Sequence, residues 1–190
     1  LKDVMEWTKY IYPGKEFAYN TSLNFDHKQL LYASVHVSPK FDIFRPTWGF
    51  NYNQQFFDTK KYGASKALSK PLLSCSLNNN FALSETMNAA IRLNASTTHA
   101  DGFLMMKSGY SVNLQFDKSF ANRTWIIYLS ANDIFKTAKE RWTMYGLGAG
   151  TTKDCYNYTR SISLQVTYNF NAKRSKYKGT GAGNEEKSRL

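Results

Sequence analysis

The feature that most constrains the fold is a hydropathy period of two that repeats along the chain. Between Ser161 and Phe170 every second residue is apolar, and the residues between them are all Ser, Gln, Thr or Asn. Such alternation predicts a β-strand with one apolar face and one polar face. The same alternation recurs along the rest of the chain, clearly in some segments and less regularly in others. These segments are residues 1–12, 17–25, 31–38, 47–53, 71–83, 87–94, 110–117 and 124–132. The sequence therefore predicts an all-β fold, an antiparallel meander of about 8–9 strands of barrel-strand length.

The composition of the polar face separates two kinds of sheet. A soluble barrel or sandwich also alternates, but its outer face is usually coated with Lys and Glu. Here the polar positions are mostly Asn, Ser, Gln and Thr, which suit a water-filled or plugged lumen. The apolar positions carry Phe, Tyr and Trp near the strand ends, as an aromatic girdle at a lipid interface does. The pattern favours a transmembrane β-barrel over a soluble sheet.

The connections between the expected strands alternate in length. Counting back from Phe170, long connections at residues 135–154, 96–107 and 58–70 are separated by short ones at residues 117–123 and 84–85. Outer-membrane barrels have short periplasmic turns and longer extracellular loops. We therefore place the end of the last strand at the periplasmic rim, and residues 133–150 in the main extracellular loop. An intermediate connection spans residues 38–46, and the first two connections are both short and do not follow the rule.

Several other classes of protein are disfavoured. No stretch of the 190 residues approaches the roughly 18 consecutive apolar residues of a membrane-spanning helix. The three histidines and two cysteines lack the spacing of a metal site, and no catalytic motif is present, so we expect neither an enzyme nor a metal or other cofactor. The Gly-rich runs at residues 146–150 and 179–183 complete no nucleotide-binding motif. We expect Cys75 and Cys155 to be free thiols, although they could pair if their strands meet.

The charge of the chain raises a different hypothesis. With 25 Lys and Arg against 14 Asp and Glu, the formal net charge is +11 at pH 7. A nucleic-acid partner would explain it, but the cations gather in the expected loops and the C-terminal tail, without the interleaved aromatic residues of an RNA-binding surface. Basic loops are better suited to the anionic lipopolysaccharide of a Gram-negative surface. We expect outer-membrane lipid and lipopolysaccharide as partners, and no nucleic acid.

The C-terminal part of the sequence resembles a known family of barrels. The resemblance covers residues 71–190 most clearly. It is carried by residues 117–120 before 125–129, then 132–135, then 160–170, and by the tail at residues 176–190. These runs are similar to the end of TonB-dependent receptor barrels, and in particular to the outer membrane protein β-barrel family. Such receptors place a plug before a barrel of about 22 strands.

The resemblance implies a location and a set of partners. Residues 1–170 would form the C-terminal portion of a transmembrane β-barrel in the cell outer membrane, and residues 171–190 a flexible basic periplasmic tail. The chain would belong to a receptor that imports a ligand, together with the N-terminal barrel and plug of the same receptor and the TonB system. Tyr168 and Phe170 match the last-strand signal that the barrel assembly machinery reads.

Two alternatives and one candidate contact surface remain open at this point. The chain could be an autonomous small outer-membrane β-barrel with a structural or adhesion role, or a soluble β-rich binding module. Within the main expected loop, Trp142 and Tyr145 could stack on a sugar or a flat chelate beside Arg141. Loops are where binding residues concentrate. The three residues form our candidate ligand-contact loop.

Overall fold

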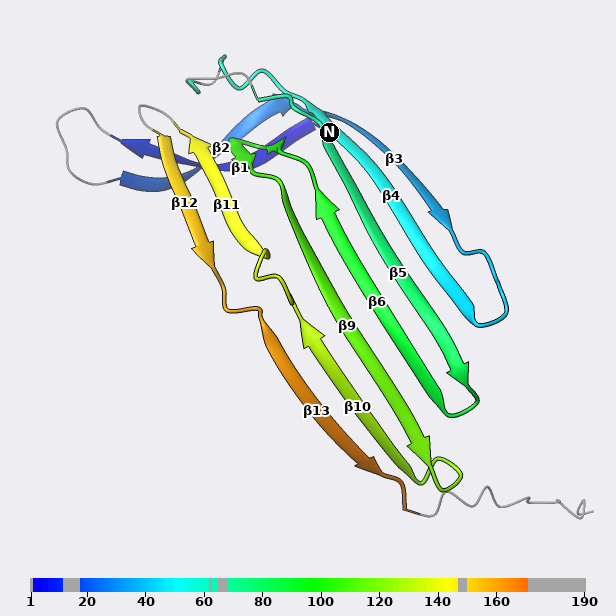
Figure 1. Cartoon of the computed structure of the whole chain (residues 1–190). Coiled ribbons are helices and arrows are strands. Elements are labelled where there is room, and N and C mark those ends of the chain that lie inside the picture. Colours follow the sequence, from blue (N-terminus) through cyan, green and yellow to red (C-terminus); the bar gives the residue numbers. More distant parts are fainter. Residues whose placement is uncertain (1, 12–17, 62, 65–67, 147–149, 171–190) are drawn as a thin grey trace, which may run out of the picture.

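The computed structural model is an all-β structure whose described strands form three antiparallel sheets (Figure 1). It describes residues 2–11, 18–61, 63–64, 68–146 and 150–170, so the tail at residues 171–190 lies outside the described part. No helix there is long and apolar enough to cross a membrane. The strands are β1 (Lys2–Ile11), β2 (Ala18–His27), β3 (Gln29–Val37), β4 (Phe44–Phe56), β5 (Leu72–Ser84), β6 (Met87–Ser96), β7 (His99–Asp101), β8 (Leu104–Met106), β9 (Gly109–Phe120), β10 (Trp125–Asn132), β11 (Lys139–Tyr145), β12 (Gly150–Tyr156) and β13 (Ser161–Tyr168).

The largest sheet has seven strands in the order β13-β10-β9-β6-β5-β4-β3. All its neighbours are antiparallel, and sequence neighbours pair except where β7–β8 and β11–β12 are inserted. Each segment that the alternation predicts as a strand forms one: seven lie in this sheet, and the first two form the separate hairpin β1–β2. The predicted all-β meander is confirmed, and the described sheet is open rather than closed into a barrel.

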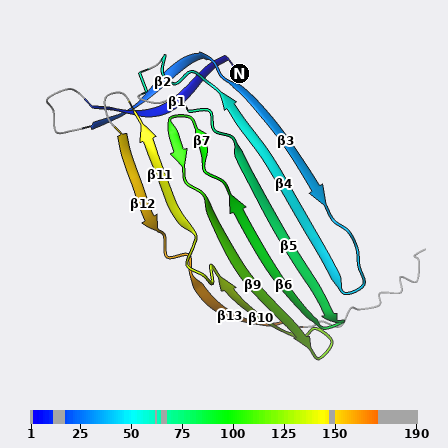
Figure 2. The same cartoon turned by 45° about the horizontal axis from the view of Figure 1, so that its top comes forward.

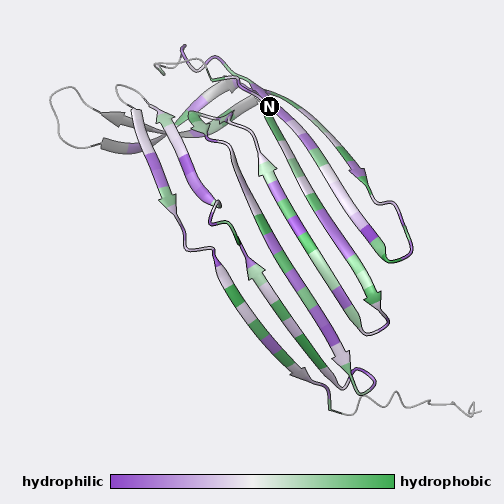
Figure 3. Ribbon diagram, viewed as in Figure 1, coloured by the Kyte–Doolittle hydropathy of each residue, from purple (hydrophilic) through white to green (hydrophobic). Residues whose placement is uncertain are grey.

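The register collects the apolar residues on one face of this sheet. Residues directly opposite each other on neighbouring strands share a face. Ile91 lies opposite Leu114, which lies opposite Ala131. The neighbouring position on each strand belongs to the other face, where Arg92 lies opposite Asn113. Along single strands the hydropathy therefore switches from residue to residue (Figure 3).

The apolar face of the sheet is exposed, and the polar face is joined by hydrogen bonds between side chains. On the apolar face, Ile162 and Leu164 are 80% and 66% exposed, and many other large apolar side chains are also exposed. A sheet in water would cover such a face with another layer, because exposed apolar area is costly. On the polar face, neighbouring strands are joined by side-chain hydrogen bonds such as that between Ser130 and Ser163, 2.6 Å long.

The two ends of the sheet differ as the connection lengths predict. At the lower end in Figure 1, short turns join β5 to β6 and β9 to β10, and a somewhat longer one joins β3 to β4. At the upper end, long connections follow β4, β6 and β10. The predicted alternation of long and short connections is therefore present in the structure.

The structure differs from the sequence prediction inside the long connections. The predicted loop at residues 96–107 contains β7 and β8, and the loop at residues 135–154 contains β11 and part of β12. These strands form a separate sheet in the order β12-β11-β8-β7. β7 and β8 have three residues each, which is too short for a period of two to be recognised.

The hairpin β1–β2 lies near the upper end of the large sheet, beside β11 (Figure 2). An ion pair joins Glu6 of β1 to the largely buried Lys28, the single residue between β2 and β3. Gly102, in the turn between β7 and β8, has a φ of +54°. A Cβ atom at Gly102 would lie 2.5 Å from Glu6 Oε2, so this turn requires glycine for both its conformation and its space.

Candidate functional site

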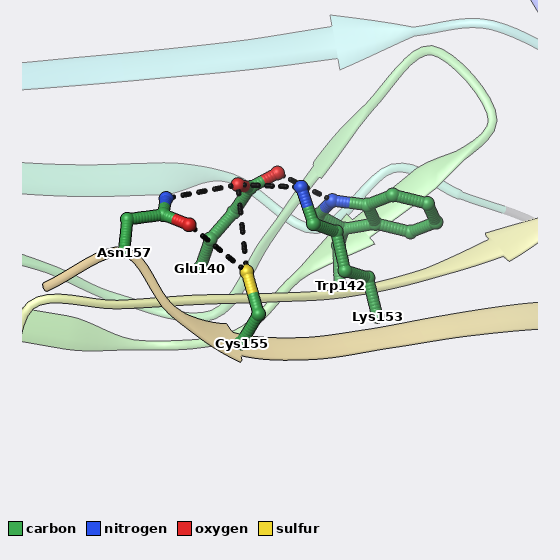
Figure 4. Close-up of polar contacts among 5 residues, drawn as sticks. All are labelled: Glu140, Trp142, Lys153, Cys155 and Asn157. Atoms are coloured by element: carbon green, nitrogen blue, oxygen red, sulfur yellow. Dashed lines mark hydrogen bonds and ion pairs between the residues drawn. The ribbon is translucent and has the colours of Figure 1, made fainter.

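One face of the β11–β12 hairpin carries a connected group of five side chains, the Glu140 cluster: Glu140, Trp142, Lys153, Cys155 and Asn157 (Figure 4). The register explains why they meet, since Glu140 lies opposite Cys155 and Trp142 opposite Lys153. The same face carries Met144, which packs against buried residues at the upper end of the large sheet. We call this the inner face of the hairpin.

The carboxylate of Glu140 is the centre of the cluster. Its Oε2 accepts hydrogen bonds from Lys153 Nζ at 2.7 Å and Asn157 Nδ2 at 3.3 Å. Its Oε1 accepts one from Trp142 Nε1 at 2.9 Å. The Cys155 thiol lies beside the carboxylate and donates to Asn157 Oδ1 at 3.2 Å. Both oxygens are therefore occupied, and the two strands are joined by side chains as well as by the backbone.

These contacts favour the charged forms of Glu140 and Lys153. The hydrogen bonds from Lys153, Trp142 and Asn157, in that order of importance, lower the pKa of Glu140 from 4.5 to about 2. The hydrogen bond to Glu140 raises the pKa of Lys153. Both groups therefore stay charged at neutral pH, where their charges cancel. A carboxylate held in this way does not exchange protons near neutral pH, so the cluster is suited to recognition and positioning rather than acid–base chemistry.

A polar cavity of about 550 Å³ lies between the hairpin and the large sheet. From the polar face of the sheet it is lined by Ser74, Asn94 and Ser111. From the hairpin region it is lined by Lys139, Glu140, Arg141 and Asn157, so the predicted contact residue Arg141 also borders it. Hydroxyl and amide groups of this kind both donate and accept hydrogen bonds. The cavity can therefore hold a hydrophilic group, with the Glu140 cluster forming part of its wall.

The turn after β10 sets the position of the hairpin through Asp133. This residue is 1% exposed, and its carboxylate accepts hydrogen bonds from the Thr137 and Ala138 backbone N–H groups at 2.8 and 3.1 Å and from Thr159 Oγ1 at 2.8 Å. Its own N–H donates to Asn113 Oδ1 at 2.8 Å. Asp133 thus ties the start of β11 to the segment before β13. The sequence signal was an Asp directly after a predicted strand, where Asp often stabilises turns.

A second buried polar residue, Gln55, joins two of the upper connections. Its Nε2 donates to Leu68 O at 2.8 Å and Gly102 O at 3.0 Å, and its Oε1 accepts from the Gly102 N–H at 2.8 Å. Beside it, the rings of Phe57 and Phe103 pack edge to face with centroids 5.7 Å apart. We call Gln55, Phe57, Leu68, Gly102 and Phe103 the upper core. Alternation places Gln55 on the polar face, but its partners could not be read from the sequence.

The comparison with protein families agrees with this geometry. The sequence model of the outer membrane protein beta-barrel family matches residues 2–168. The chain belongs to this family. The protein is therefore located in the outer membrane, and the exposed apolar face of the large sheet is its lipid-facing surface. Neither a curated protein nor a solved structure matches the chain.

Membership in this family gives the two ends of the barrel sheet their sides. In outer-membrane barrels the end with short turns is periplasmic and the end with long connections is extracellular. The upper core, the polar cavity and the Glu140 cluster thus belong to the extracellular end. The lower end carries a row of aromatic rings. The ring centroids of Trp125 and Tyr168 are 4.4 Å apart, and Tyr168 packs edge to face on Phe170 with centroids 4.5 Å apart. The role of Tyr168 and Phe170 as an assembly signal stays a prediction.

The candidate contact residues of this barrel protein lie on β11 rather than in a loop, and they do not form one surface. Trp142 is on the inner face, where its indole N–H is bound to Glu140. Arg141 and Tyr145 occupy alternate positions and therefore belong to the opposite, outer face. Arg141 Nη2 donates to Ser108 O at 2.7 Å, and the Tyr145 N–H donates to Phe103 O at 2.9 Å. Of the three, only Trp142 belongs to the face that carries the Glu140 cluster.

The other reactive side chains of the barrel are scattered. Cys75 and Cys155 are both free, on β5 and β12. Among the described residues, no group of three or more His, Cys, Asp or Glu side chains could hold a metal ion. The polar cavity and the Glu140 cluster are therefore the candidate site, and sequence reasoning identified only Trp142 of that cluster.

Proposed function

We propose that the chain is part of the barrel wall of a TonB-dependent receptor that takes up a ligand across the Gram-negative outer membrane. The observation that carries this proposal is the open edge on each side of the large sheet. Within the described residues, the outer edges of β3 and β13 have no strand partner. Unpaired backbone groups are not tolerated in lipid. Further strands must close this barrel, and seven strands is also fewer than the roughly eight of the smallest bacterial barrels.

The polar side of the wall supports transport as the function of the closed barrel. Its inward positions are mostly uncharged Asn, Ser and Gln, and the cavity at the extracellular end has Asn and Ser side chains on its sheet side and charged side chains on its hairpin side. Such a lumen suits a hydrophilic ligand or a hydrogen-bonded plug. In this proposal Trp142 and the Glu140 cluster take part in ligand capture, while the N-terminal barrel, the plug and the TonB system act through the rest of the receptor.

The first test is an immunoblot of outer-membrane fractions of the native organism, with an antibody against residues 173–190. A receptor predicts a band several times larger than 21.8 kDa. A band at 21.8 kDa would contradict the proposal and point to a small barrel that closes by another route.

The second test addresses uptake. A strain that lacks the gene and a strain that lacks TonB are grown with single iron chelates or oligosaccharides as the nutrient. The proposal predicts that both strains fail on the same nutrient and grow normally on small sugars. Growth of the gene-deleted strain on every nutrient that the TonB strain cannot use would reject transport of these ligands.

A further inference from the structure

A carboxamide side chain, that of Asn79 on β5, belongs to the lipid-facing surface of the large sheet. Asn79 lies opposite Ile91, which lies opposite Leu114, so the three residues share the apolar face. On β5 the positions two residues before and after it on this face are Leu77 and Phe81. The period of two predicts an apolar residue between them. Asn79 breaks this pattern, although a polar group is costly where lipid replaces water.

The row that contains Asn79 lies at the depth of the hydrocarbon region. It includes Leu114, which is between Tyr110 and Phe120 near the two ends of β9. At about 3.3 Å per residue and a strand tilt of about 40°, Tyr110 and Phe120 are separated by about 25 Å along the membrane normal. This is the height of the apolar band of outer-membrane barrels. The carboxamide of Asn79 is therefore not at the level of the lipid headgroups.

Trp48 of β4 holds this carboxamide in one orientation. The indole Nε1 of Trp48 donates to Asn79 Oδ1 at 3.0 Å. An indole N–H can only donate, so the oxygen must face Trp48 and the Nδ2 amino group must lie on the other side of the carboxamide. Trp48 is opposite Leu77 and Asn79 is opposite Pro46, so the bond runs diagonally between the strands. Pro46 is less than 2% exposed, which shows that the surface around this bond is closely packed.

The amino group of Asn79 has no acceptor among the described residues. Its Nδ2 takes part in no hydrogen bond there, and it is not buried by the protein. The Oδ1 atom keeps one lone pair, because the bond from Trp48 uses the other. The hydrocarbon region provides no water to satisfy either group. The side chain is thus pre-oriented for a partner that both donates and accepts a hydrogen bond within the bilayer.

A second copy of this chain provides such a partner at the correct depth. Two copies in one membrane have the same orientation, so a two-fold axis along the membrane normal can relate them. This axis brings identical positions together at identical heights. The Nδ2 of each Asn79 can then donate to the remaining lone pair of the other Oδ1, which gives two reciprocal hydrogen bonds. The surrounding apolar side chains pack against their own counterparts.

We propose that two copies of the protein associate in the outer membrane through the lipid-facing surface of β4 and β5. The Asn79 carboxamides pair on the two-fold axis, and Trp48 orients them. An apolar groove of about 620 Å³ lies on the same strands towards the extracellular end, lined by Phe50, Leu73 and Cys75. Large apolar side chains of the second copy can enter this groove. The proposal rests on the outer-membrane location, and it is independent of ligand uptake.

The first experiment measures dimerisation of the full-length protein in lipid vesicles. The protein carries one dye at its C-terminus, and single-molecule photobleaching counts the molecules in each spot as the lipid-to-protein ratio increases. The variants are Asn79→Leu, which removes the carboxamide, and Trp48→Phe, which removes the donor that orients it. Asn78→Leu is the matched control, because Asn78 is the adjacent residue on the polar face, opposite Arg92.

The unsubstituted protein should form dimers whose fraction decreases on dilution with lipid. Asn79→Leu should weaken dimerisation by about tenfold, as expected for the loss of two hydrogen bonds in a membrane. Trp48→Phe should weaken it by about threefold, because the carboxamide is still present but can rotate. Asn78→Leu should leave it unchanged. Migration as a folded protein on unheated gels checks each variant. Monomers at every dilution, or equal dimerisation of Asn79→Leu, would overturn the proposal.

The second experiment identifies the neighbour in intact outer membranes. Leu77→Cys, in a chain that also carries Cys75→Ser and Cys155→Ser, is treated with a short bismaleimide. The control is Leu129→Cys on β10, which is on the same surface but three strands away from β5. A product of twice the protein's mass with Leu77→Cys alone supports the proposal. A product that contains a different membrane protein would show that another partner occupies this surface and would overturn it.

Discussion

The barrel sheet and the extracellular region above it are both built from antiparallel strands, but they face different solvents. On the sheet, Leu164 is 66% exposed, and that surface is satisfied by lipid. In the extracellular region, Phe103 is 1% exposed and packs on Phe57, as a side chain does in a water-soluble domain. The membrane stabilises the apolar face of the sheet, whereas the region above must provide a core of its own.

This difference predicts that the two regions are sensitive to different kinds of substitution. Truncation of a large side chain should damage the upper core, where it leaves a cavity, and should hardly affect the lipid-facing surface. A charge introduced on the lipid-facing surface should be costly even though truncation there is not, because lipid cannot solvate it. The three predictions that follow test this contrast, from the largest effect to the smallest.

Phe103→Ala should destabilise the extracellular region by about 3–5 kcal/mol, the range for loss of a buried Phe. We expect residues 57–61, next to Phe57, to become sensitive to protease in intact outer membranes, while the barrel still migrates as a folded protein on unheated gels. The control is Phe120→Ala, which truncates a 42% exposed aromatic on the lipid-facing surface. Loss of the folded band in Phe103→Ala would show that the two regions unfold together.

Leu114→Lys places a charge near the middle of the lipid-facing surface, in the row that contains Ile91 and Ala131. We expect a loss of about 2–4 kcal/mol in the free energy of unfolding, measured by denaturant titration of the full-length protein in lipid vesicles. The matched control is Gln115→Lys, one residue along β9 on the polar face. Equal effects of the two substitutions would contradict the assignment of the faces.

Acid should weaken the Glu140 cluster only below about pH 4.5. Since the pKa of Glu140 is about 2 when folded and 4.5 otherwise, its contacts stabilise the hairpin fully above about pH 4.5. This stabilisation decreases as the pH falls and is lost below about pH 2. The measurement is the fluorescence of Trp142 as a function of pH, obtained by subtracting the fluorescence of the Trp142→Phe variant from that of the unsubstituted protein. Glu140→Gln should abolish the acid transition, and a midpoint near 4.5 in the unsubstituted protein would show that the contacts are absent.

Most of the sheet could be predicted from the sequence because its pattern is dictated by two solvents. Lipid and water on opposite faces impose a period of two, which residues 161–170 show without exception. The four short strands of the extracellular region are not under this constraint. All seven residues of β11 are partly buried or exposed. Neither face of this strand is fully buried, so no strict alternation of apolar and polar residues is imposed on it.

The candidate site was less predictable for a related reason. Trp142, Tyr145 and Arg141 are close in sequence, and in a loop they could share one surface. On a strand, alternation separates Arg141 from Trp142. The indole N–H of Trp142 binds Glu140, two residues away on the same strand, and Lys153 of β12 lies opposite it. The hydrogen bonds of Gln55 and Asp133 depend on which connections meet in space, which a single sequence does not record.

The bond between Gln55 and Gly102 also has a consequence for the order of assembly. It joins residues 47 apart in the chain, whereas the sheet hairpins at the periplasmic end close over short turns. Contacts between distant residues form late, because the intervening chain must be ordered first. The upper core therefore completes itself only after β4, β5 and β6 are paired. A molecule with a mispaired strand would carry an open extracellular end, so cleavage by surface proteases at residues 57–61 reports on whether the barrel has been assembled correctly.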